Sequence, residues 1–147
     1  MVHLELSIEI RRPPTDVFAY VANFENDPDW KSAVRSVTRT SDGPLNVGST
    51  FEQTAGFMGK SVVIPYEVTE FDPGTEIRYE STGGPFPVDI VRRVEPVAEG
   101  AQFTTDITAA SENFFDLAKP VLQRVGAEHV RGDLAVLKAY LESREAV

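Results

Sequence analysis

Cysteine is absent from this 147-residue chain, and histidine occurs only twice. The absence of cysteine excludes disulfides, thiolate metal sites and cysteine nucleophiles. Positive charge is also scarce: the chain has 14 Lys and Arg residues but 23 Asp and Glu residues, which gives a formal net charge of −9 at pH 7. Such a chain would on average repel a nucleic-acid backbone, so we expect no nucleic-acid partner.

No apolar stretch approaches the roughly 20 residues that span a bilayer, so we expect no stable membrane insertion. The first ten residues alternate polar with apolar and lack the basic region and apolar core of a secretory signal. We therefore expect a cytoplasmic protein. Its length and its 41% apolar content fit one domain, residues 1–147, with its own core.

Residues 3–10 predict a β-strand, because their apolar and polar side chains alternate with a period of two. Pro13 and Pro14 end it. Thr15 or Asp16 is then expected to cap a short helix that runs to about residue 23. A second helical turn over residues 28–31 places Trp30 as an apolar plug near the edge of the protein.

Six further strands are predicted from segments rich in Val, Ile, Thr, Tyr and Phe between Gly and Pro. They cover residues 34–41, 50–58, 61–71, 76–82, 88–97 and 101–110. Their alternation predicts that four sets of side chains share one concave face. These are Phe51, Gln53, Ala55 and Phe57; Val62, Ile64, Tyr66 and Val68; Ile77, Tyr79 and Ser81; and Phe103, Thr105, Ile107 and Ala109.

After Ser111 the period becomes helical and remains so to about Arg144. The predicted apolar stripe of this helix consists of Phe114, Ala118, Val121, Leu122, Val125, Val136 and Tyr140. Pro120 is expected either to kink the helix or to begin its straight part. The pattern thus predicts a sheet followed by one long helix.

This order of elements resembles the START-like or Bet v 1-like (SRPBCC) superfamily, including its polyketide cyclase/dehydrase group. The resemblance rests on PPTDVFAYVANFENDPDWKSAV at 13–34, LNVGSTFEQ at 45–53, VTEFDPGTEIRYES at 68–81 and DLAVLKAYLES at 133–143. It implies an α+β helix-grip fold, β-α-α-β6-α, in which a seven-stranded curved antiparallel sheet wraps around the long C-terminal helix. It also implies an enclosed cavity, which in relatives receives lipids, sterols, polyketides or plant hormones.

Small residues make such a cavity physically plausible, because they leave space between the sheet and the helix. The candidates are Ala55, Ala109, Ala118, Gly126 and Gly132. The alternative is that phenylalanines fill the space completely. These are Phe51, Phe57, Phe86, Phe103 and Phe114.

Six polar residues are candidates for ligand contacts: Gln53, Tyr66, Tyr79, Arg92, Thr105 and His129. His129 is expected on the inner stripe of the last helix, where an imidazole can bind a carbonyl or transfer a proton. A core histidine satisfied by a neighbouring side chain is the alternative. The two tyrosines suit either ligand orientation or ordinary packing.

Arg92 shares its parity with the inward residues of its strand, which favours it over Arg93 as the buried arginine. If buried, it requires a carboxylate partner or an acidic ligand, and the alternative is a strand-edge side chain with its head in solvent. His3 and His129 lie on separate predicted elements, so we expect no metal site, and no motif indicates a cofactor.

The first functional hypothesis is therefore a module that binds a small hydrophobic molecule such as a lipid or a polyketide. The second is an enzyme similar to polyketide cyclase/dehydrases, with His129 as the catalytic acid or base, assisted by Tyr66 or Tyr79. A protein-interaction module is the third. The sequence leaves open the ligand, whether catalysis occurs and whether the protein forms a homodimer.

Overall fold

Seven strands form one sheet in the computed structural model, which describes residues 2–57, 59–110 and 119–144, the side chains of 57 and 119–122 excepted. The strands are β1 (Val2–Ile10), β2 (Val34–Arg39), β3 (Thr50–Phe57), β4 (Lys60–Asp72), β5 (Glu76–Ser81), β6 (Val88–Val97) and β7 (Gly100–Ala109). All neighbours are antiparallel, in the order β1-β7-β6-β5-β4-β3-β2. The predicted sheet is confirmed, with strand ends within about two residues of those expected.

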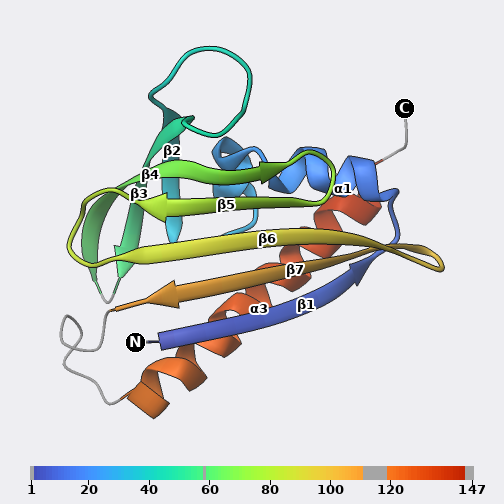
Figure 1. The fold of residues 1–147 in the computed structure, drawn as a ribbon. Coiled ribbons are helices and arrows are strands. Elements are labelled where there is room, and N and C mark those ends of the chain that lie inside the picture. Colours follow the sequence, from blue (N-terminus) through green and yellow to red (C-terminus); the bar gives the residue numbers. More distant parts are fainter. Residues whose placement is uncertain (1, 58, 111–118, 145–147) are drawn as a thin grey trace.

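The sheet is curved, and its concave face receives the long helix α3 (Lys119–Ser143), as Figure 1 shows. Register shifts between Val68 and Glu70 in β4, and between Val34 and Ser36 in β2, interrupt the ladder at the two strands. Such bulges bend a strand and increase its twist. The α+β helix-grip architecture expected from the sequence is therefore the one observed.

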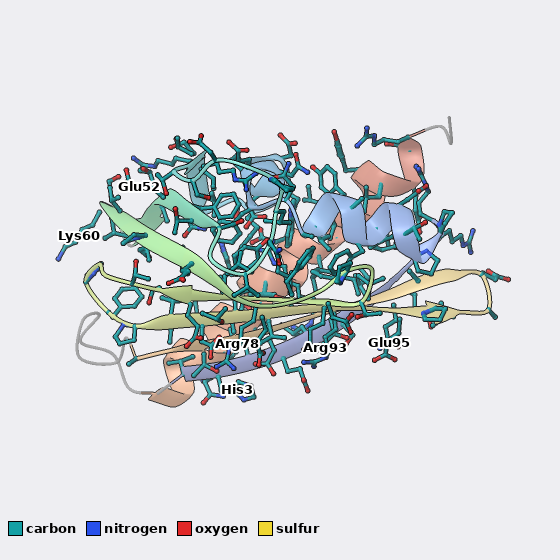
Figure 2. The ribbon with its side chains drawn as sticks, turned by 45° about the horizontal axis from the view of Figure 1, so that its top comes forward. His3, Glu52, Lys60, Arg78, Arg93 and Glu95 are labelled. Atoms are coloured by element: carbon teal, nitrogen blue, oxygen red, sulfur yellow. The ribbon has the colours of Figure 1, made fainter. Side chains whose placement is uncertain are left out.

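Charged side chains occupy the opposite face of the sheet. Arg78 contacts Asp89 at 2.5 Å, and Arg93 contacts Glu5 at 2.7 Å. Both arginines project away from α1 in Figure 2. This face is therefore covered by polar pairs, and the apolar residues of the same strands point toward α3.

Two short helices follow β1 and cover one end of the concave face. The first, α1 (Pro14–Val21), begins after Pro13 without a side-chain cap, so the expected cap by Thr15 or Asp16 is wrong. Pro14 supplies the first helical residue with its preset φ angle. Asp16 instead pairs with Arg12 at 2.9 Å.

The second short helix, η1 (Phe24–Asp29), is a 3-10 helix that starts four residues before the expected turn at 28–31. Asn23 Oδ1 accepts a hydrogen bond from the Glu25 N–H at 3.2 Å, which fixes its start. Trp30 follows directly and is only 3% exposed, with its ring edge-on to Phe103. It therefore lies in the core and not near the edge of the protein.

The buried stripe of α3 differs from the predicted one. Val125 and Val136 are 60% and 49% exposed. Spacings of four, three and four residues instead link the buried side chains, which are Val130, Leu134, Leu137 and Leu141. The predicted Phe114, Ala118, Val121 and Leu122 lie outside the described side chains, and among the described residues no helix has the length and hydropathy to cross a membrane.

Candidate ligand-binding cavity

The concave face is filled at one end and hollow at the other. At the filled end, the ring of Phe24 in η1 stacks on Tyr79 with centroids 4.4 Å apart. Its centroid lies 5.1 and 5.7 Å from those of Tyr66 and Phe51. At the hollow end, between the sheet and the first part of α3, lies a cavity of about 520 Å³. This volume falls in the usual range for small-molecule sites.

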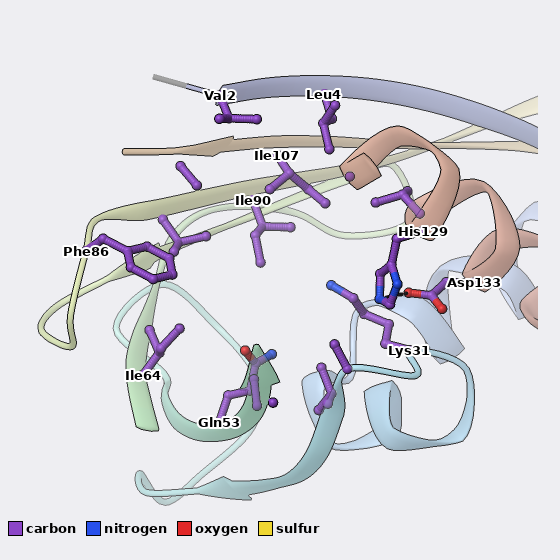
Figure 3. A pocket seen from close by; sticks show the side chains of 18 of the residues that line it. Val2, Leu4, Lys31, Gln53, Ile64, Phe86, Ile90, Ile107, His129 and Asp133 are labelled. Atoms are coloured by element: carbon purple, nitrogen blue, oxygen red, sulfur yellow. Dashed lines mark ion pairs between the residues drawn. The ribbon is translucent and has the colours of Figure 1, made fainter. Parts of the chain in front are cut away.

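The walls of the cavity are mainly apolar (Figure 3). Its described lining consists of Val2, Leu4, Lys31, Ala33, Val34, Gln53, Ala55, Gly56, Ile64, Tyr66, Phe86, Val88, Ile90, Ile107, Ala109, Val125, Gly126, His129, Val130 and Asp133. The strands therefore supply most of the wall, and α3 closes one side.

Small residues contribute to this space, as expected for Ala55, Ala109 and Gly126. A Cβ atom on Gly126 would lie 3.0 Å from Leu4 Cδ1, so glycine allows α3 to approach β1 there. Gly132 is exposed and does not line the cavity. Phe86 is part of the wall but does not fill the space, so the proposed filling by phenylalanines is not seen among the described side chains.

His129 lies at the mouth of the cavity. It lines the space, yet 47% of its side chain is exposed, so its imidazole is not directed solely toward the sheet as expected. The neighbouring lining residue Val125 is also exposed. The cavity therefore opens beside this part of α3.

A buried carboxylate lies one helical turn after His129. Asp133 Oδ1 accepts hydrogen bonds from the backbone N–H and the hydroxyl of Ser32, at 3.2 and 3.0 Å. Its Oδ2 lies 3.6 Å from His129 Nε2 and has no hydrogen-bond partner among the described residues. Ser32 Oγ is also 3.3 Å from His129 Nε2. These three side chains form a group able to bind and move a proton.

Lys31 belongs to the same end of the cavity (Figure 3). Its backbone N–H donates to the Asp27 carbonyl at 2.8 Å, which continues the turn of η1 and sends the side chain inward. Burial lowers the pKa of the Lys31 amine, and the nearby Arg92 adds to this effect, whereas the carboxylates of Asp27 and Asp133 oppose it. Gln53 and Lys31 both line the cavity and give this part of its wall a polar character.

Arg92 is buried but lies outside the cavity lining. Its guanidinium makes hydrogen bonds of 2.8 and 2.7 Å to the Asp27 carboxylate and one of 2.9 Å to the Val21 carbonyl. The ring centroids of Phe24 and Trp30 lie 5.3 and 5.2 Å from it. The inward orientation and the need for a carboxylate were predicted correctly, whereas the strand-edge alternative is wrong.

The remaining candidates divide between the two ends. Gln53 and Tyr66 line the cavity, and burial raises the pKa of the Tyr66 hydroxyl. Tyr79 donates its hydroxyl hydrogen to the Ala22 carbonyl and lies outside the lining, as does the buried Thr105 beside Arg92. The structure thus brings Gln53, Tyr66 and His129 to one cavity and places Tyr79, Arg92 and Thr105 elsewhere.

Two charged residues of the cavity, Asp133 and Lys31, were not among the candidates from the sequence. Asp133 could have been found, because it lies four residues after His129 and therefore on the same face of a helix. Lys31 carried no such signal. Within residues 2–57, 59–110 and 119–144 no group of His, Asp and Glu side chains is arranged to hold a metal ion.

A curved antiparallel sheet that grips a C-terminal helix around an apolar cavity defines the Bet v 1-like class of proteins. The chain belongs to the family described as "Polyketide cyclase / dehydrase and lipid transport", which matches residues 1–142. No curated protein matches it.

Several solved structures share the fold. A START superfamily protein from Mycobacterium smegmatis has a TM-score of 0.78 at 13% identity, covering 95% of this chain and 97% of that one. The di-domain ARO/CYC StfQ from the steffimycin biosynthetic pathway has a TM-score of 0.76 at 18% identity, with 97% of this chain and 51% of that one covered. For Ara h 8.0201 the TM-score is 0.68 at 21% identity, with 97% and 98% covered.

Proposed function

We propose that this protein binds a small, mostly apolar molecule in the cavity between the sheet and α3. The observation that carries the proposal is a hollow of about 520 Å³ with apolar walls and a polar group at one end. Burial of the apolar part supplies about 25 cal/mol per Å² of affinity, less the cost of ordering the ligand. The few polar side chains then orient it.

Native mass spectrometry of freshly purified protein, with extraction of any bound molecule, tests this proposal directly. A neutral environment-sensitive dye, N-phenyl-1-naphthylamine, provides a second readout. We expect the dye to bind and a co-purifying apolar molecule to compete with it. Protein that carries no guest and does not bind the dye would contradict the proposal.

A matched pair of variants locates the binding. Ala109 lines the cavity, whereas its neighbour Thr108 lies on the other side of β7. Ala109→Phe should fill the space and abolish dye binding, and Thr108→Phe should leave it intact. Thermal unfolding of both variants checks that they are folded.

The second candidate is a cyclase or dehydrase of the polyketide type, in which the same cavity holds a flexible chain while a proton is moved. The observation that favours it is the His129 imidazole beside the Asp133 carboxylate at the mouth of the cavity. The family description and the ARO/CYC relative support the same chemistry. A base oriented by a carboxylate is typical of proton-transfer sites.

His129→Gln tests this candidate with a poly-β-ketone substrate. The variant should lose cyclisation but still bind the neutral dye. His3→Gln is a matched control, because His3 lies on the outer face and pairs with Asp106. Full activity of His129→Gln would show that His129 is not the catalytic base.

A further inference from the structure

The Lys31 side chain points into the cavity (Figure 3). It is partly buried, and its amine makes no hydrogen bond or ion pair with any described residue. The amine lies over the Trp30 ring, whose centroid is 5.9 Å from Nζ. A surface lysine normally keeps its ammonium group in water. Here the amine faces the space where a guest must lie.

The carboxylates of Asp27 and Asp133 act on the Lys31 amine from nearby. Both oxygens of Asp27 bind Arg92, whereas Asp133 binds Ser32 through Oδ1 and its Oδ2 has no hydrogen-bond partner among the described residues. Neither carboxylate forms an ion pair with Lys31 among the described contacts. The buried Arg92 guanidinium lies behind Asp27 and disfavours a second positive charge. A desolvated lysine next to another cation is the usual setting for a nucleophilic amine.

We propose that Lys31 is a covalent capture site, which binds an aldehyde or ketone group of an apolar guest as a reversible imine. This inference rests on the proposed binding function and names the chemical class of the guest. The lowered pKa of Lys31 supports it, because only the neutral amine attacks a carbonyl carbon.

The reaction requires no oxidant, reductant or second substrate. The lone pair of Nζ forms a bond to the carbonyl carbon, the C=O π pair moves to oxygen, and transfer of an amine proton gives a neutral carbinolamine. Protonation of the hydroxyl then releases water as the nitrogen lone pair forms C=N, and the resulting iminium loses its N–H proton to give the neutral imine. The unpartnered Asp133 Oδ2 and the His129 imidazole lie at the same end of the cavity to carry these protons. Hydrolysis reverses each step.

Reductive trapping tests the proposal. The protein is incubated with 3-phenylpropanal, an apolar aldehyde, and sodium cyanoborohydride between pH 6 and pH 10, and the modified lysines are mapped by peptide mass spectrometry. Each unit by which a lysine pKa falls raises its neutral fraction at pH 7 about tenfold. We therefore expect Lys31 to be labelled at least several-fold faster than the solvent-accessible Lys60 and Lys138 at pH 7, with the difference decreasing toward pH 10.

Matched variants complete the experiment. Lys31→Arg keeps the charge but cannot form the imine, so the fast labelling should disappear, whereas Lys60→Arg should leave it unchanged. If Lys31 reacts no faster than Lys60 and Lys138 at any pH, the inference is overturned.

The neutral dye distinguishes this failure from failure of the proposed function. Dye binding that persists in Lys31→Arg, together with slow labelling of Lys31, would leave the cavity function standing and remove only the covalent step. Absence of dye binding in the wild-type protein would instead remove the cavity function.

Discussion

Arg92 and Asp27 form a bidentate ion pair in which neither side chain is exposed. Asp27→Ala should destabilise the protein by about 3–5 kcal/mol, because it leaves a buried guanidinium without its partner. Urea unfolding of the single variants and of Asp27→Leu/Arg92→Met measures this, and the double variant should recover much of the loss. As a control, Arg78→Ala in the pair with Asp89, whose side chains are 33% and 31% exposed, should cost about 1 kcal/mol or less. An equally small effect of Asp27→Ala would show that the ion pair is solvated.

Gly100 and Gly132 should respond oppositely to replacement by alanine. A Cβ on Gly100 would overlap the Ile10 carbonyl oxygen, so Gly100→Ala should destabilise the protein by about 1–3 kcal/mol. Gly132 is exposed within α3 with no atom near its would-be Cβ, so Gly132→Ala should stabilise by about 0.5–1 kcal/mol. Chemical denaturation compares them, and two effects of the same sign would contradict the packing described around Gly100.

Lys31→Met should stabilise the protein at neutral pH. The folded-state pKa of Lys31 lies below its ordinary value of 10.5, so the unfolded chain binds the proton more tightly. The resulting penalty is complete below the folded-state pKa and fades as the pH rises toward 10.5. The advantage of Lys31→Met in urea unfolding should therefore shrink between pH 7 and pH 10. A constant difference would mean that the amine is hydrated.

Tyr79→Phe and Tyr66→Phe should separate folding from binding. The Tyr79 hydroxyl satisfies the buried Ala22 carbonyl, so its loss should cost about 1–3 kcal/mol of stability and leave dye affinity unchanged. Tyr66 lies on the cavity wall, so its variant should alter dye affinity. Thermal unfolding and dye titration provide the two readouts. Reduced affinity in Tyr79→Phe would show that the filled end also contacts the guest.

The strands were predictable because each residue of a half-buried strand repeats the same period-two signal. The buried stripe of α3 was not predictable, because valines occur on more than one side of this helix. Only contact with the sheet decides that Val130 is buried and that Val125 and Val136 are exposed. Asn23, whose side chain caps η1, shows the same limit: cap residues occur at several positions in this stretch, and tertiary packing selects one.

For the candidate site, the sequence predicted only which side chains lie on the concave face of the sheet. Alternation correctly turned Gln53, Tyr66 and Tyr79 inward, but it contains no information on which part of that face is filled. Phe24 of η1 decides this by packing on Tyr79, far away in the sequence. The direction of Lys31 depends on the same helix, so no local pattern reveals it.

The division of the concave face has a consequence for the size of the guest under the proposed function. Lys31 follows directly after the turn that Arg92 holds in place through Asp27, so the fold fixes where its side chain enters the cavity. The opposite end of the chamber is bounded by Val2 and Phe86, which lie away from that anchor (Figure 3). If the proposed function holds, substitutions at these two positions would alter the length of guest accepted and leave the Arg92–Asp27 ion pair unchanged.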